Sequence, residues 1–309
     1  MNATIIMSEA KTVFGIKPAP IMASFSSRGP NLVVPSILKV KKFHSLATLV
    51  LFLLFQPHIT APGVNILAAF SEAASASNLP SDTRRGFPFN VLQGTSMSCP
   101  HIAGVAGLLK TLHPNWSPAA IKSAIMTTAS ARDNTKRPIP DAFDKTLATP
   151  FAYGSGHVEP DLAMDPGLVY DISVSDYLNF LCAYGYDQTL ILALNSNKSF
   201  TCSKSVSTTD LNYPSITLPN IDLSVVNVTR TVTNVGPPST YNANVNLPGF
   251  KIVVVPNSLT FKKPGEKKTF IVIVQATRAT RPVNYTFGEL RWTNNVTHIV
   301  RSPIVARLN

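Results

Sequence analysis

From about Thr208 to the C-terminus, the sequence consists of short runs in which apolar and polar residues alternate. The runs include VVNVTRTVTNV, FKIVVV and KTFIVIVQA, and turns rich in Pro, Gly and Asn separate them. A period of two places one side of each run in a core and the other side in solvent, which is the pattern of β-strands. This pattern over about 100 residues predicts an all-β sandwich for residues 208–309.

The preceding region has a different character. The stretch Ser96–Leu112 is apolar on almost every side, so we expect a helix that is buried on most of its surface. A second helix is expected to begin at Ser117, a favourable N-cap residue, with Pro118 at the first helical position. Short apolar runs that favour strands precede the first helix. We therefore expect helices and short strands in this half of the chain.

Ser96 lies at the start of the first predicted helix, two residues after Gly94. A serine hydroxyl is a weak nucleophile until a base accepts its proton. The start of a helix presents free N–H groups and the positive end of the helix dipole, which can stabilise an oxyanion. A serine that only caps a helix occupies the same position. The local sequence therefore leaves both interpretations open.

Length and composition restrict the functional classes. The 309 residues are enough for two domains, and 45% hydrophobic with 14% charged residues is a globular composition. The formal net charge is +11, but the basic residues are scattered and show no pattern of interleaved aromatic residues. We therefore expect no nucleic-acid partner.

The cysteines and glycosylation sequons favour an extracellular protein. Cys182 and Cys202 are 20 positions apart and can pair, which leaves Cys99 in the apolar helix as a small buried thiol. The three cysteines lack the spacing of a metal site. Sequons begin at Asn2, Asn115, Asn197, Asn227, Asn284 and Asn295. Glycosylation is predicted at four of them, Asn197, Asn227, Asn284 and Asn295, and these sequons together with a disulfide indicate secretion.

The N-terminal residues MNATIIMSEAK lack the basic segment and the long apolar run of a signal peptide. We therefore expect the sequence to begin within a longer protein. Residues 40–56 contain an almost wholly apolar core, Leu46–Phe55, with neither an amphipathic period nor caps. Ten apolar residues are fewer than the roughly 20 that span a bilayer as a helix, so no membrane anchor is expected. The segment is predicted to be foreign to its neighbours.

Several motifs resemble those of the plant subtilisin-like serine proteases, the subtilases similar to cucumisin. GTSMSCPHIAGVAGLLK resembles the nucleophile motif of that family, and PAPIMASFSSRGPN, ITAPGVNILAAF and WSPAAIKSAIMTTA resemble segments around it. LNYPSI, TRTVTNVG and RSPIVA resemble its C-terminal fibronectin type III-like domain. The resemblance implies an α/β fold, part of the subtilisin-like parallel sheet with its helices, followed by an all-β fibronectin type III-like sandwich.

The resemblance also implies a domain organisation. Residues 1–39 would end the family's protease-associated insert and return to the peptidase domain, residues 57–207 would form the C-terminal part of that domain, and residues 208–309 the fibronectin type III-like domain. Joining Lys39 directly to Pro57 gives KPHITAPG, which restores the family pattern except at His58. Codons for Val40 and Gln56 are compatible with GT and AG intron boundaries. Residues 40–56 are therefore interpreted as a translated intron.

By the resemblance, Ser96 matches the family nucleophile, and its backbone N–H would supply one oxyanion donor. The implied reaction is hydrolysis of polypeptide substrates through an acyl-enzyme, without a metal or an organic cofactor. The implied location is extracellular, in the apoplast.

The family's catalytic Asp and His belong to motifs upstream of the serine, and those motifs are absent here. Asp82, His44 and His58 precede the serine but lack the family's flanking residues, and His101 and His157 are interpreted as structural. Loss of the serine–histidine unit in such enzymes lowers the rate by about 10⁶-fold. We therefore expect this chain to be inactive alone. The alternative is a non-catalytic binding or regulatory remnant that uses the β-sandwich.

Overall fold

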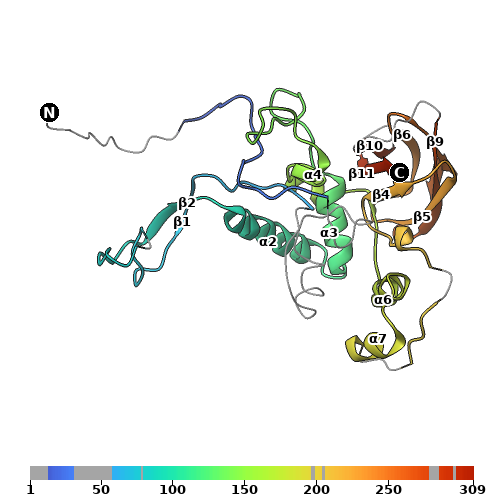
Figure 1. The fold of residues 1–309 in the computed structure, drawn as a ribbon, viewed down its shortest axis with the longest axis horizontal. Coiled ribbons are helices and arrows are strands. Elements are labelled where there is room, and N and C mark those ends of the chain that lie inside the picture. Colours follow the sequence, from blue (N-terminus) through green and yellow to red (C-terminus); the bar gives the residue numbers. More distant parts are fainter. Residues whose placement is uncertain are drawn as a thin grey trace.

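The computed structural model describes residues 13–30, 58–77, 79–195, 199–203, 206–277, 285–294 and 297–309. Residues 40–56, which include His44, and the sequon residues Asn2, Asn197, Asn284 and Asn295 lie outside the described residues. A helical region and a β-sandwich lie side by side in the described part, with the sandwich formed by the C-terminal residues (Figure 1).

In the part of the helical region that the structure describes, a hairpin is followed by the long helix α2 and three shorter helices. The antiparallel strands β1 and β2 precede the long helix α2, and their bounds are Ile66–Ala69, Phe89–Leu92 and Thr95–Leu112. The helices α3, α4 and α5 follow, with bounds Pro118–Thr127, Pro150–Tyr153 and Pro160–Met164. The predicted start of α3 is confirmed, because the Ser117 hydroxyl accepts a hydrogen bond from the Ala120 N–H at 3.0 Å.

The prediction that α2 is buried on most sides is wrong. α3 has a buried residue at nearly every position, but Leu109 is the only buried residue of α2. Leu109 packs with Ile121 and Ile125 of α3, whereas Leu108 is 66% exposed. The helix has apolar residues on all sides, yet the described residues pack against only one side of the helix. Apolar composition therefore did not determine burial here.

The two-part fold class is confirmed: a region of helices and short strands precedes a β-rich domain. The pairing within the first part is sparse. Its hairpin is antiparallel, and the parallel pairing among its described residues consists of two isolated bridges, Met22 with Asp141 and Thr60 with His157. The second bridge matters for the site below, because it fixes the strand-like segment that passes beneath the start of α2.

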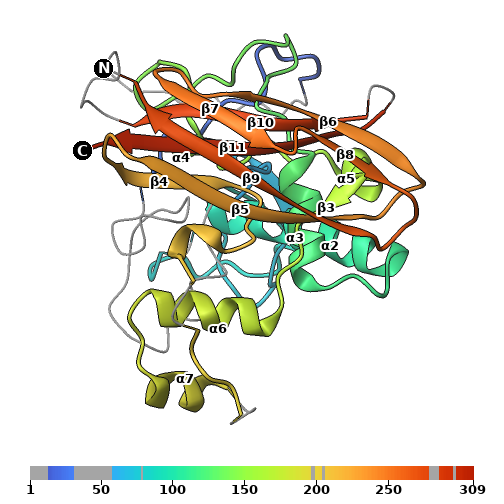
Figure 2. The ribbon, with the colours of Figure 1, turned by 90° about the vertical axis from the view of Figure 1, so that its right-hand side faces the viewer.

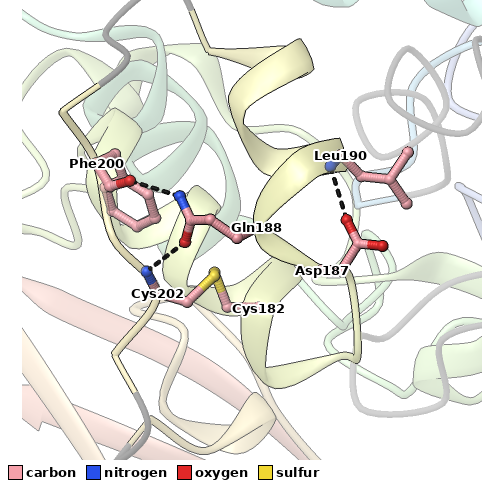
Figure 3. The surroundings of a disulfide bond; sticks show 6 residues. All are labelled: Cys182, Asp187, Gln188, Leu190, Phe200 and Cys202. Atoms are coloured by element: carbon pink, nitrogen blue, oxygen red, sulfur yellow. Dashed lines mark hydrogen bonds between the residues drawn. A yellow bond between two sulfur atoms is a disulfide. The ribbon is translucent and has the colours of Figure 1, made fainter.

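Two helices and a disulfide form a lobe beneath the sandwich (Figures 2 and 3). The helices α6 and α7 span Val174–Ala183 and Gln188–Leu194. The structure joins Cys182 of α6 to Cys202 with an S–S distance of 2.10 Å. Gln188 lies beside this bond, where its side chain donates to the Phe200 carbonyl at 2.7 Å and accepts from the Cys202 N–H at 3.1 Å. The disulfide and the amide together hold residues 200–202 against the two helices.

The third cysteine differs from its prediction. Cys99 is free and exposed in the second turn of α2, whereas the sequence favoured a buried thiol. The cause is the same as for the whole helix, because the face on which Cys99 lies has no covering element among the described residues.

The β-sandwich has two sheets with a shared core (Figure 2). One sheet has the order β4-β11-β10-β6-β8, with bounds Ile216–Ile221, Ile299–Leu308, Thr286–Thr293, Ser239–Asn246 and Ser258–Phe261. The other has the order β3-β5-β9-β7, with bounds Leu168–Val169, Val225–Asn234, Lys267–Ala276 and Phe250–Val255. Among the described strands of these two sheets, only β4 and β11 pair in parallel. A 3₁₀ turn, Thr208–Asp210, precedes β4.

One strand of the sandwich, β3, comes from the helical region. β3 lies about forty positions before Thr208, yet Leu168 pairs with Asn234 and the Leu168 side chain lies in the sandwich core. Phe151 also reaches the sandwich, where its ring meets those of Tyr285 and Phe287 edge-on at 4.8 and 5.1 Å. The two regions are therefore joined by backbone pairing and by aromatic packing.

Candidate active site

Ser96 lies in the first turn of α2, where the chain enters from β2 through Gly94. The N-cap residue Gly94 has φ 155° and ψ 162°, a conformation that is open essentially only to glycine. The Ser96 side chain is exposed, and its hydroxyl forms no hydrogen bond with any described residue. The turn therefore presents an unpaired hydroxyl to solvent at the beginning of an 18-residue helix.

The electrostatic environment at this helix start is positive. The first turns of a helix leave backbone N–H groups without intrahelical partners, and the helix dipole adds partial positive charge there. No acidic residue occupies the first turn of α2, and no side chain of the described residues caps it. An oxygen that develops negative charge beside Ser96 would therefore be stabilised by uncompensated N–H groups.

A neighbouring loop fixes the position of the turn. The Gly94 N–H donates to the Gly63 carbonyl at 2.8 Å, and the Ser98 hydroxyl donates to the Ala61 carbonyl at 3.0 Å. Ala61 is buried with Leu109 in the core of the helical region. The start of α2 is therefore tied to the core through two hydrogen bonds.

The sequence candidates for a catalytic acid or base do not reach Ser96. The Asp82 carboxylate accepts hydrogen bonds from Ser77 Oγ at 2.6 Å and from Arg84 Nε at 2.9 Å. The hydrogen bond from Arg84 holds the pKa of Asp82 well below its ordinary value, so this carboxylate is a paired anion. The His58 ring is half-buried, with its centroid 5.5 Å from that of Tyr213.

The two histidines that the sequence assigned to structural roles have local partners. His101 Nδ1 lies 2.8 Å from the Met97 carbonyl of its own helix. His157 forms backbone bridges with Thr60 and Ser130, and burial lowers the pKa of its imidazole. Among the described residues, no imidazole or carboxylate forms a hydrogen bond with Ser96.

Sequence reasoning missed the loop beneath the serine. The sequence feature that could have indicated this loop is Ala-Pro-Gly at residues 61–63, which the sequence analysis used only as part of a family motif. The spacing in sequence gave no indication that Ala61 and Gly63 would contact Ser98 and Gly94, because more than thirty residues separate them.

A separate cavity of about 280 Å³ lies between α6, the 3₁₀ turn and β5, and Ser96 is not among its lining residues. Arg230 lines it and is buried, and burial lowers the pKa of its guanidinium to about 10. That guanidinium donates to the carbonyls of Thr209, Tyr213, Ser215 and Thr229 at 2.7–3.2 Å. Its role is therefore to hold this corner of the sandwich.

The described residues contain no group of three or more His, Cys, Asp or Glu arranged to hold a metal ion.

Family models match both parts of the chain. The model described as "Subtilase family" matches residues 4–156, and the model described as "Fibronectin type-III domain" matches residues 210–306. The first match contains Ser96 and the loop beneath it. The second spans the sandwich from the 3₁₀ turn to β11.

Plant proteases are similar to this chain along nearly its whole length. A subtilisin-like protease of Glycine max is 67% identical over 305 residues, which is 98% of this chain and 36% of that protein. The subtilisin-like proteases SBT5.4 and SBT5.3 of Arabidopsis thaliana are 53% and 51% identical over 95% and 98% of this chain, and 35% and 37% of their own lengths. The chain thus spans about a third of the length of these relatives. Because the subtilase model matches the region of the serine turn, and because these relatives are similar along nearly the whole sequence, the chain belongs to the subtilase family.

Proposed function

We propose that Ser96 is the nucleophile of a subtilisin-like serine endopeptidase whose substrates are polypeptides. Its Oγ would attack the peptide carbonyl, its proton would pass through a base to the leaving amine, and water would hydrolyse the acyl-enzyme. The Ser96 N–H would donate to the oxyanion. The observation that carries this proposal is the exposed, unpaired hydroxyl at the positive end of α2, on a turn that Gly94 makes accessible.

We also propose that these 309 residues alone do not turn over substrate. No described imidazole or carboxylate is hydrogen-bonded to Ser96, so among the described residues no group is placed to accept the proton of its hydroxyl. The base and its orienting acid would come from the part of the relatives that this chain does not match, which is about two thirds of their length.

A chimeric protein tests both statements. The Glycine max relative is prepared with residues 1–39 and 57–309 of this chain in place of its matching segment, and Ser96→Ala is the matched control. The unmodified chimera should hydrolyse peptides and be labelled by a fluorophosphonate at Ser96, whereas Ser96→Ala and the 309-residue chain alone should do neither. A folded chimera without labelling would contradict the nucleophilic role and favour the alternative, a non-catalytic remnant that binds through its sandwich.

We further propose that the protein is secreted to the apoplast and glycosylated at Asn197, Asn227, Asn284 and Asn295. Asn227 is exposed on β5, as an acceptor must be, and a disulfide such as Cys182–Cys202 persists in oxidising compartments. No helix in the described part of the chain has the length and apolarity that crossing a bilayer requires.

For the domain organisation, we propose the boundaries 1–39, 57–207 and 208–309, with residues 40–56 a translated intron. Removal of that segment restores the family pattern around the Ala-Pro-Gly loop. RNA reads that pass from the codon of Lys39 directly to that of Pro57 are expected. Reads that run continuously through residues 40–56 in all transcripts would reject the proposal.

A further inference from the structure

Ser98 and Ser96 lie in the same turn of α2 but project to different sides. Residues two apart on a helix do not face each other. Ser96 is exposed, whereas Ser98 is half-buried and bonded to the Ala61 carbonyl. The direction of the Ser96 hydroxyl depends on the rotation of this turn about the helix axis, and Ser98 is a side chain of this turn that is hydrogen-bonded to the neighbouring loop.

The loop beneath Ser98 is itself held firmly. The Thr60 N–H donates to the Gly156 carbonyl at 2.7 Å, and the Val158 N–H donates to the Thr60 carbonyl at 2.9 Å. The next residue, Ala61, is 9% exposed within the core cluster of the helical region. The acceptor of the Ser98 hydroxyl is therefore a fixed point.

Gly63 shows how closely the loop and the turn fit. A Cβ at this position would lie 2.3 Å from Ser98 Oγ and 2.9 Å from the Gly94 carbonyl oxygen. Contacts under about 3.0 Å are essentially never found for real Cβ atoms, so the absence of a side chain at Gly63 is a condition of this geometry. The start of α2 has no side-chain cap of its own, which leaves this loop as its anchor.

We propose that Ser98 is a positioning residue for the reaction of Ser96: its hydrogen bond to Ala61 sets the rotation of the first turn and so the direction of the nucleophile. The inference rests on the proposed function of Ser96. Catalytic groups must be held within about 0.5 Å of their productive position. A displacement of about 1 Å can lower the rate by about 100-fold.

Hydrogen exchange in the 309-residue chain tests the structural part independently of activity. Ser98→Ala should increase exchange of the Gly94 amide, which is bonded to Gly63. Ser117→Ala is the matched control, because it removes a hydroxyl that caps another helix, α3. Unchanged exchange at Gly94 in Ser98→Ala would overturn the proposal.

Kinetics of the chimera test the positioning role. Ser98→Ala should lower kcat and the rate of fluorophosphonate labelling by about 10- to 100-fold with KM nearly unchanged. Ser117→Ala should keep kcat, and Ser98→Thr, which keeps the hydroxyl, should recover much of it. Gly63→Ala should lower kcat as well, since its Cβ displaces Ser98.

The outcomes separate the two proposals. An unmodified chimera that is active, with Ser98→Ala turning over at the same rate, would overturn the positioning role alone. Equal losses of kcat in Ser98→Ala and Ser117→Ala would also overturn it, because the effect would then be general destabilisation. A folded, unmodified chimera without labelling would overturn the proposed function and the positioning role with it.

Discussion

The hydroxyl of Tyr170 accepts a hydrogen bond from Ser302 at 2.9 Å, across the junction between the helical region and β11. Both residues are 1% exposed. Tyr170 follows β3, the strand that the helical region contributes to the sandwich, so this bond fixes the two parts of the chain to each other at a dry position.

Tyr170→Phe should lower the free energy of unfolding by about 1–2 kcal/mol, because the buried Ser302 hydroxyl then loses its acceptor. Urea denaturation measures the change. Tyr213→Phe is the matched control: the Tyr213 hydroxyl is also buried but has no hydrogen-bond partner among the described residues. Its removal should be neutral or stabilising. Equal destabilisation by both substitutions would contradict this account of the junction.

Alkaline pH should destabilise the fold through its buried tyrosines. Burial raises the pKa of Tyr170 to about 12, above the ordinary value of 10.0. Between these pH values the unfolded chain releases the phenolic proton while the folded chain retains it, so stability is complete below about pH 10 and falls as the pH rises. Burial also raises the pKa of Tyr213 and Tyr241, which should add to the loss.

Unfolding free energies measured between about pH 9 and about pH 11.5 should therefore decline with pH, by up to about 1.4 kcal/mol per pH unit for each tyrosine. In Tyr170→Phe the decline should be shallower. An identical slope in the variant would show that Tyr170 does not contribute.

Arg230→Lys should destabilise the sandwich by about 3 kcal/mol or more, because a lysine cannot supply the planar set of donors to four backbone carbonyls. Arg84→Lys is the control at an exposed site, where the cost should be within about 0.5 kcal/mol. Chemical denaturation compares the two variants. A cost for Arg230→Lys as small as that for Arg84→Lys would refute the structural role of the buried guanidinium.

Reduction of the Cys182–Cys202 disulfide should lower stability by about 3 kcal/mol, the loop-entropy value for a closed loop of about 20 residues. The paired substitutions Cys182→Ser and Cys202→Ser should reproduce the effect of reductant. Cys99→Ser should leave stability unchanged, since that thiol is free and exposed. Denaturation in the presence and absence of reductant provides the measurement, and a loss confined to Cys99→Ser would be incompatible with this pairing.

Expression through a secretory pathway should place an N-linked glycan on Asn227, which is exposed on β5. Asn115 is also exposed, but Pro118 directly follows its sequon, so it should remain unmodified. Mass spectrometry after enzymatic deglycosylation in heavy-oxygen water distinguishes the two sites. Asn227→Gln should lose the corresponding mass, and an unoccupied Asn227 in the secreted protein would contradict the prediction.

The sequence by itself determined those features that depend on neighbouring residues. Alternation with a period of two identified strands of the sandwich such as β5 and β9, and Ser117 with Pro118 identified the start of α3. The helix at Ser96 was also correct in kind and nearly in extent. Each of these features depends on local backbone geometry and on which side of the element is apolar. Residues a few positions apart in the sequence determine both properties.

Tertiary structure decided which of those sides acquired a partner. The apolar pattern of α2 did not reveal that only Leu109 would be buried, and Leu168 and Val169 gave no sign that they would complete a sheet with β5. The bond from Ser98 to Ala61 joins residues 37 positions apart. Such contacts depend on which distant segments pack against each other in space. The local periodicity of a sequence does not specify this packing.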